Sequence, residues 1–275
     1  MADHDLTGFE RSTFSAQGKT RDVLRVGTGP AVIVMAEMPG ITPKVLGFAE
    51  SIASIGCSAV LPVLFGTPGR DANPEIHGMA RSIAYMMSSL VPACVSREFV
   101  VWATGRTSPV VAWLRDLAEA EHKRCGGPGV GAVGMCFTGG FALAMATDAR
   151  IVAPVLSQPS LPLGATARQR SSIDISGADL EAVKSRCARG DLEVVGLRFK
   201  GDRIVPKERF DFLRDQLGDA FVAVELNDSD ANPDAAMKPH SVLTEHLIDE
   251  PGQPTRDALD LVLELFQTRL LAEPI

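Results

Sequence analysis

Short, predominantly apolar stretches recur along the chain and alternate with segments of helical periodicity. Residues 31–36, Ala-Val-Ile-Val-Met-Ala, are apolar at every position, as is typical of a strand buried on both faces of a parallel sheet. A shorter run at residues 23–26 precedes them. Similar runs predict further strands at residues 59–64, 130–135, 151–155, 192–199 and 220–226.

The intervening segments predict helices. In residues 44–55 the apolar side chains Val45, Phe48, Ala49 and Ile52 fall on one side of a helix. Strands that alternate with helices in this way form βαβ units. We therefore expect an α/β fold with a mostly parallel, doubly wound sheet and helices on both faces. Further helices are expected at residues 78–124, with a break near 104–109, and at 178–188, 206–217 and 254–271.

The length of 275 residues suits a single domain of this class. Residues 1–20 are polar and are expected to form an N-terminal extension or an edge hairpin, whereas residues 21–275 are expected to form the α/β domain. Residues 66–77 are rich in Gly, Pro, Asp and Asn, which predicts a long surface loop.

Composition and charge exclude several classes of function. The net charge of -7 leaves no basic surplus for nucleic acid, and no apolar run is long enough to span a membrane. The first residues lack the basic and apolar segments of a signal peptide. The five cysteines are scattered and form no CxxC pair, so neither a disulfide framework nor a zinc site is indicated. We expect a reduced, cytoplasmic protein without cofactor or metal; its oligomeric state is not indicated.

Reactive side chains follow several of the expected strands. In open parallel sheets, ligands bind outside the carboxyl ends of the strands. Glu37 follows the strand at 31–36, Cys136 follows 130–135, and Asp202 follows 192–199. His240 lies on the loop after the last strand. The chain order is therefore nucleophile, acid, histidine, which is the order of the triad in α/β-hydrolases.

The sequence Gly134-Met135-Cys136-Phe137-Thr138-Gly139 is expected to form a sharp strand-to-helix turn that projects Cys136. Small neighbours are needed two positions before and after the nucleophile. Gly134 meets this need, but Thr138 is β-branched and disfavours a tight turn. The helix N-terminus would favour a thiolate. The backbone N–H groups of Phe137 and Met38 are the expected oxyanion donors.

Alternatives exist for the acid and the base. Asp202 lies in a Gly-Asp turn before Pro206, where an aspartate can also serve only to close a turn or cap a helix. His246 competes with His240, but its setting is typical of a solvent-exposed histidine on a short helical turn. The loop position of His240 would let its imidazole reach both Cys136 and Asp202, so we favour it as the base.

Together, the Gly-x-Cys turn at 134–136, Glu37 after the early strand, the Gly-Asp turn at 201–202 and the late His240 resemble the dienelactone hydrolase family of α/β-hydrolases. The resemblance spans residues 20–270. It implies that Cys136 attacks an ester or lactone carbonyl, that His240 acts as base and acid, and that Asp202 orients it. It also implies that Glu37 approaches the resting thiol.

Two features depart from the family pattern. Thr138 replaces the usual glycine, and no arginine follows His240 until Arg256, although the family's dienelactone-cleaving members use arginines to hold a substrate carboxylate. Arg70, in the loop at 66–77, could supply one of them. The expected partner is thus a small-molecule ester or lactone. A thioesterase or acyltransferase with the same triad, and a non-catalytic relative that binds a small molecule or a partner, remain alternatives.

Overall fold

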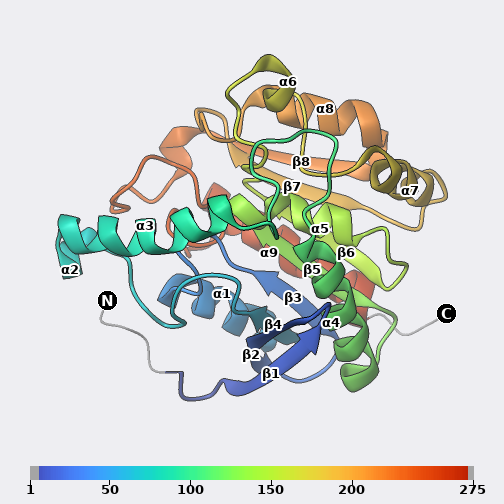
Figure 1. The fold of residues 1–275 in the computed structure, drawn as a ribbon, viewed down its shortest axis with the longest axis horizontal. Coiled ribbons are helices and arrows are strands. Elements are labelled where there is room, and N and C mark those ends of the chain that lie inside the picture. The colour runs from blue at the N-terminus through green and yellow to red at the C-terminus, as the bar shows by residue number, and fades with distance from the viewer. Residues whose placement is uncertain (1–5, 272–275) are drawn as a thin grey trace.

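The computed structural model describes residues 6–271. An eight-stranded sheet crosses these residues in the order β1-β2-β4-β3-β5-β6-β7-β8 (Figure 1). The first pairings, β1 with β2 and β2 with β4, are antiparallel, and the remaining ones are parallel. The strands are β1 Glu10–Ala16, β2 Lys19–Gly27, β3 Ala31–Met35, β4 Ser58–Pro62, β5 Val130–Met135, β6 Ile151–Ser157, β7 Val194–Phe199 and β8 Phe221–Leu226.

Helices cover both faces of the sheet (Figure 1). One apolar core joins the sheet to α4, α5, α7 and α8, and a second core joins its other face to α1 and α9. The expected doubly wound α/β fold is therefore confirmed. The helices are α1 Pro43–Ser54, α2 Pro74–His77, α3 Met79–Val95, α4 Val110–Cys125, α5 Gly139–Met145, α6 Ala167–Arg170, α7 Gly177–Ala188, α8 Lys207–Leu217 and α9 Pro254–Phe266.

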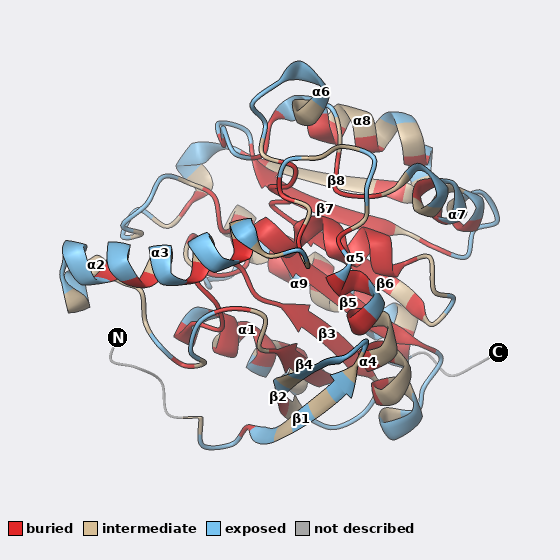
Figure 2. Cartoon of the chain, viewed as in Figure 1, coloured by how far each residue is buried: buried red, intermediate tan, exposed pale blue. Residues whose placement is uncertain are grey.

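The central strands are buried because both of their faces lie under helices. Every residue of β3, β4, β5 and β7 is buried, which matches the predominantly apolar character of these segments (Figure 2). The edge strand β1 pairs only with β2 and is exposed or half-buried throughout. It forms a hairpin with β2 through a turn at Gln17–Gly18, so the edge pairing continues past residue 20. Residues 1–5 of the expected extension lie outside the described part.

The expected helical segment at 78–124 is two helices, α3 and α4, and the connection between them runs from residue 96 to residue 109. The closing helix α9 ends at Phe266 and is followed by a π-helical turn, Gln267–Leu271. Across residues 6–271, no helix combines the length and the apolar character needed to cross a bilayer. The carboxyl ends of β3, β5, β6 and β7 meet at one edge of the sheet, and the candidate site lies there.

Candidate active site

Cys136 occupies a sharp turn between β5 and the helix that follows it. Its backbone has a φ of 52°, in the left-handed region that residues with a Cβ rarely adopt. A short 3₁₀ turn, Cys136–Thr138, continues directly into α5. Such strain at a reactive residue persists only where the surrounding structure enforces it. The thiol is half-buried and therefore reachable from solvent.

Glycines on both sides of Cys136 allow the turn to close. A Cβ atom on Gly134 would lie 2.1 Å from the carbonyl oxygen of Thr138. A Cβ atom on Gly139 would lie 2.4 Å from the Cα atom of Pro159, in the segment after β6. Both distances are far below any normal contact, so only glycine fits at either position. The close approach needed after the nucleophile is thus provided by Gly139, three residues on.

Thr138 supports the tight turn, so the expectation that a β-branched residue would loosen it is wrong. Its side chain is fully buried. The hydroxyl oxygen accepts a hydrogen bond from the Met135 N–H at 2.9 Å and donates to the carbonyl oxygen of Met35 at 2.8 Å. Because Met35 belongs to β3 and Met135 to β5, the hydroxyl connects the ends of two neighbouring strands beneath the turn.

His240 and Asp202 form a buried pair. The two residues are only 6% and 8% exposed, and Nδ1 of His240 lies 2.6 Å from Oδ2 of Asp202. The other carboxylate oxygen of Asp202 accepts a hydrogen bond from the Ile204 N–H at 2.9 Å. This second contact fixes the carboxylate, which in turn orients the imidazole ring. The predicted acid and base, far apart in the sequence, therefore lie together.

The remaining ring nitrogen of His240, Nε2, is buried and makes no well-formed hydrogen bond within residues 6–271. Burial disfavours the imidazolium, but the charge of Cys136 and the contacts with Asp202 and Cys136 outweigh it, and they raise the pKa of His240 well above its usual 6.5. Cys136 is among the groups that raise this pKa, which indicates that its side chain lies close to the ring.

Ser160, which the sequence did not indicate, also contacts Cys136. Its hydroxyl donates to Sγ of Cys136 at 3.4 Å, and its backbone N–H donates to the Cys136 carbonyl oxygen at 2.9 Å. Ser160 follows β6, which is hydrogen-bonded to β5. A donor at this position stabilises negative charge on the sulfur. The position of Ser160 after a strand end is a signal that could have identified it.

Glu37 binds the loop that carries His240, and its approach to the thiol, which the family resemblance implies, stays a prediction. Its carboxylate is buried and accepts hydrogen bonds from the hydroxyls of Ser241, at 2.5 Å, and Thr244. A third donor is Nε2 of Gln158, at 3.2 Å. Ser241 is the residue next to His240. The carboxylate therefore holds the loop that carries His240.

His246 is buried, 1% exposed, and the expectation of a solvent-exposed ring is wrong. Its Nδ1 accepts a hydrogen bond from the Ser241 N–H at 3.1 Å, and its Nε2 donates to the carbonyl oxygen of Met237 at 3.1 Å. Burial lowers the pKa of His246, which keeps the ring neutral and able to accept at Nδ1. His246 thus braces the same loop from its other side.

The two expected oxyanion donors lie at the same edge of the sheet. Phe137 is the second residue of the 3₁₀ turn, where N–H groups have no partner within the helix. Met38 follows Glu37 in the loop after β3, and β3 pairs directly with β5. The Phe137 ring packs against Phe65, Phe99 and Phe141, which anchors the start of the helix. The role of the Phe137 and Met38 N–H groups as oxyanion donors stays a prediction.

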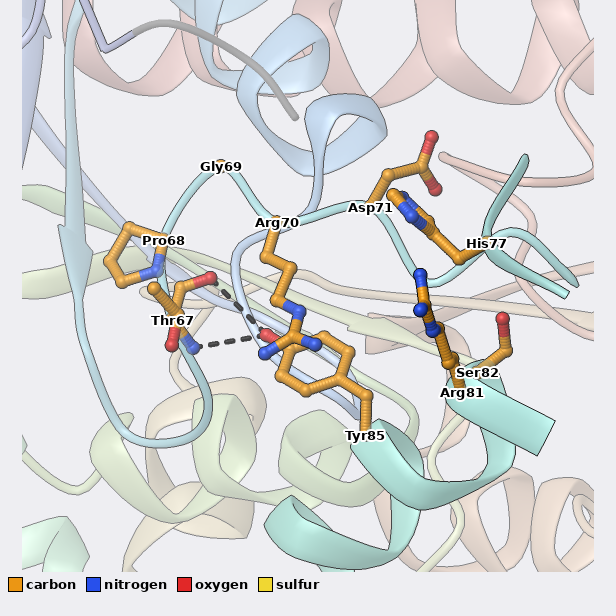
Figure 3. Close-up of a pocket in the computed structure, with 9 residues that line it drawn as sticks. All are labelled: Thr67, Pro68, Gly69, Arg70, Asp71, His77, Arg81, Ser82 and Tyr85. Atoms are coloured by element: carbon orange, nitrogen blue, oxygen red, sulfur yellow. Dashed lines mark hydrogen bonds between the residues drawn. The ribbon is translucent and has the colours of Figure 1, made fainter. Parts of the chain in front are cut away.

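Arg70 lies apart from the triad in the lining of a cavity of about 470 Å³ (Figure 3). Its guanidinium stacks over the ring of Tyr85 at 4.2 Å, and the Tyr85 hydroxyl accepts from the Thr67 N–H at 3.0 Å. None of the triad residues lines this cavity, so the substrate role of Arg70 stays a prediction. Within residues 6–271, no group of His, Cys, Asp or Glu side chains is arranged to hold a metal ion.

Comparisons with known proteins place this geometry in a family. No curated protein matches the sequence. Among solved structures, dienelactone hydrolase from Anabaena variabilis is 19% identical, covers 95% of this chain and 98% of its own, and has a TM-score of 0.52. A dienelactone hydrolase-like promiscuous phosphotriesterase from metagenomic libraries is 16% identical, with coverage of 95% and 98% and a TM-score of 0.58. The thioesterase domain from the curacin biosynthetic pathway is 9% identical, with coverage of 93% and 99% and a TM-score of 0.55.

These three structures share the fold of the chain. The sequence itself gives the more specific result, because residues 21–180 match the model of the dienelactone hydrolase family. This match spans more than half of the chain and includes the Cys136 turn and Glu37. The chain therefore belongs to the dienelactone hydrolase family and is an ester-bond hydrolase.

Proposed function

We propose that the protein hydrolyses a small ester or lactone through an acyl-enzyme on Cys136. The observation that carries this proposal is the strained backbone of Cys136, whose φ of 52° projects the thiol at the start of a helix, next to the buried His240–Asp202 pair. A structural thiol has no need of such a backbone. The half-buried setting also leaves the sulfur open to a substrate.

The first half of the reaction forms the acyl-enzyme. The raised pKa of His240 favours an imidazolium beside a Cys136 thiolate. The thiolate attacks the carbonyl carbon, and the oxyanion accepts hydrogen bonds from the N–H groups of Phe137 and Met38. Collapse of this intermediate breaks the bond to the alkoxy oxygen. His240 then transfers its Nε2 proton to that oxygen, which leaves as the alcohol or, in a lactone, as the freed hydroxyl end.

The second half releases the acid. Neutral His240 takes a proton from a water molecule, whose oxygen adds to the thioester carbonyl. The second tetrahedral intermediate expels the Cys136 thiolate and gives the carboxylic acid. The proton remains on His240, so the resting ion pair is restored. Asp202 holds the ring in one orientation throughout and stabilises its charge.

Glu37 acts in this scheme as a positioning residue. Its hydrogen bonds to Ser241 and Thr244 hold the histidine loop against the loop after β3, which also carries Met38. We expect Glu37→Ala to lower kcat by roughly 10- to 100-fold, by analogy with residues that orient the ligands of metal sites. Glu37→Gln should recover part of the loss. The imidazole NMR signal of His240 should broaden or shift in Glu37→Ala, which a change confined to substrate binding would not cause.

Arg70 is the proposed contact for a substrate carboxylate. Its stacked guanidinium lies at a cavity wall, where a planar donor group suits a carboxylate. Arg70→Ala should therefore raise KM for an ester with a free carboxylate and leave KM for the matching neutral ester unchanged. Equal effects on both esters would remove Arg70 from the substrate site.

The proposal is tested with an activated aryl ester, by rate and by intact mass. The wild type should turn over the ester and gain a transient acyl mass, and Cys136→Ala should do neither. Cys94→Ala is the matched control, because Cys94 is also half-buried but lies in α3. Equal behaviour of wild type and Cys136→Ala would overturn the nucleophile and favour a non-catalytic binding protein. Transfer of the acyl group to an added thiol or alcohol in preference to water would favour an acyltransferase.

A reducing compartment suits this chemistry. All five cysteines are free, and a thiolate nucleophile is lost when it is oxidised. We therefore propose a cytoplasmic location. Reversible loss of activity with hydrogen peroxide, restored by a thiol reductant, would support this requirement for reducing conditions.

A further inference from the structure

Helix α3 turns its apolar side to solvent. Met79, Ile83, Met87, Val91 and Val95 recur at every fourth position and are between 46% and 77% exposed. Figure 2 shows this outward side of α3 as a largely exposed band at the edge of the molecule. An ordinary surface helix has the opposite arrangement, with its apolar stripe toward the core. The row of five residues is called the α3 row below.

The buried side of the same helix is more polar than its exposed side. Its buried residues are Ser82, Tyr85, Ser89 and Ala93. The hydroxyls of Ser82 and Ser89 have no hydrogen-bond partner among the described residues. Two hydrogen bonds between the Tyr85 hydroxyl and the backbone of Thr67 fix the rotation of the helix about its axis. The helix cannot turn the apolar row toward the core without breaking these bonds.

We infer that the α3 row is the contact surface of a homodimer in which two copies of α3 pack against each other. Residues four apart form a ridge, and two such ridges interdigitate when the helices cross at about -50°. A two-fold axis brings the same patch of each copy together, so a single row is sufficient. The axis would pass near Met87, the middle residue of the row.

The exposed area fits a second copy. Five large side chains at these exposures present on the order of 500 Å² of apolar surface, at the upper end of the largest patch on a typical monomer. Two copies would bury about 1,000 Å² through the rows alone, and the exposed Ala80, Ala84 and Pro92 beside them bring the total into the range of specific interfaces, about 1,200 Å² or more.

The charge on the helix also fits a second copy. Arg81 is the single charged residue in Met79–Val95, so two copies can approach without repulsion between like charges. A helix that lies on an anionic membrane instead needs several basic residues along its polar side. The chain as a whole carries a net charge of -7, which disfavours such a membrane.

Dimer formation would also affect the cavity that Arg70 lines, because α3 forms part of its wall. Arg81, Ser82 and Tyr85 of α3 line that cavity (Figure 3), and none of them belongs to the row. A partner helix packed on the row would therefore hold one wall of the cavity in place. The inference does not depend on the proposed nucleophile.

The test is the oligomeric state of the full chain, measured by sedimentation velocity over a range of concentrations. The wild type should show a concentration-dependent dimer. Met87→Glu and Ile83→Glu should weaken the dimer by roughly 30-fold or more, the effect expected for a central interface anchor. Ser88→Glu is the matched control, since it adds the same charge to an exposed position one residue off the row. Circular dichroism should show that all three variants keep the fold.

A second measurement defines the geometry. Met87→Cys should form a covalent dimer under mild oxidation, and Ser88→Cys should not exceed the wild-type background. A wild type that stays monomeric at all concentrations would overturn the inference, as would a dimer that Met87→Glu and Ser88→Glu weaken equally. Flotation of a monomeric wild type with phosphatidylserine vesicles would assign the row to a lipid surface and overturn it as well.

Discussion

The hydroxyl of Thr138 offers a sharp test of how the nucleophile turn is held. Thr138→Val keeps the β-branched shape but removes the hydroxyl. Two hydrogen bonds are lost, the one accepted from the Met135 N–H at 2.9 Å and the one donated to the Met35 carbonyl at 2.8 Å. Each contributes about 1 kcal/mol, and a buried N–H that loses its partner costs about 1–3 kcal/mol more. We expect the free energy of unfolding to fall by roughly 3–5 kcal/mol.

The assay is urea unfolding followed by circular dichroism, combined with the rate of acylation by the aryl ester. Thr138→Ser retains the hydroxyl and should lose about 1 kcal/mol, the value of one buried methyl group. Thr147→Val is the matched control, because the Thr147 hydroxyl makes a single half-buried bond to the Ala144 carbonyl at 3.2 Å. Its loss should cost under about 1 kcal/mol.

The acylation rate separates stability from positioning. If the hydroxyl ties β3 to β5 beneath Cys136, Thr138→Val should acylate more slowly even when it is fully folded. A variant that unfolds with less than about 1 kcal/mol of lost stability and acylates at the wild-type rate would refute this reasoning. Thr138 would then be an ordinary core residue that happens to stand in the turn.

Three further predictions concern the same site. Asp202→Asn should lower kcat/KM by roughly 10³- to 10⁴-fold, as in other triads, and NMR titration should show the pKa of His240 falling, because a hydrogen bond and a charge that raise it are lost. Since the folded-state pKa of His240 is raised, its contribution to stability is fully present below about pH 6.5 and is lost as the pH rises through the folded-state pKa. Thermal unfolding across this pH range should show a larger loss of stability for the wild type than for Asp202→Asn. Gly134→Ala should lose roughly 2–4 kcal/mol of stability in urea unfolding, because its Cβ would lie 2.1 Å from a backbone oxygen, whereas Gly177→Ala, with open space around the Cβ, should be neutral or stabilising.

The fold was predictable because a strand that is buried on both faces is a short run of consecutive apolar residues in the sequence. The segment at 130–135 is apolar or glycine at every position and is β5, buried throughout. The same reasoning located β3 from residues 31–36. The edge strand β1 is solvated and has no such pattern, and the expected extension or hairpin reflected that ambiguity. The break expected near residues 104–109 is present, but it begins earlier, at residue 96, because α3 ends at Val95.

The candidate site residues were predictable for a topological reason. Parallel strands bring their carboxyl ends to one edge, so the residues after β5 and β7 lie at the same edge of the sheet, with β6 between the two strands. That rule predicts Cys136 and Asp202 as site residues. His240 lies on a long loop, and the rule says only that such a loop can reach the site. Its 2.6 Å contact with Asp202 depends on how the loop is held.

The contacts that hold the His240 loop could not be predicted from the sequence. Glu37 and Ser241 are 204 residues apart, and their hydrogen bond depends on the side-chain rotamers of both residues. A carboxylate after a buried strand can face either the thiol or the histidine loop, since both lie at the same edge of the sheet. The hydroxyls of Ser241 and Thr244 favour the histidine loop, because they supply the hydrogen-bond donors that a buried carboxylate requires. A thiolate would instead repel the carboxylate. Glu37 therefore binds the loop that carries His240.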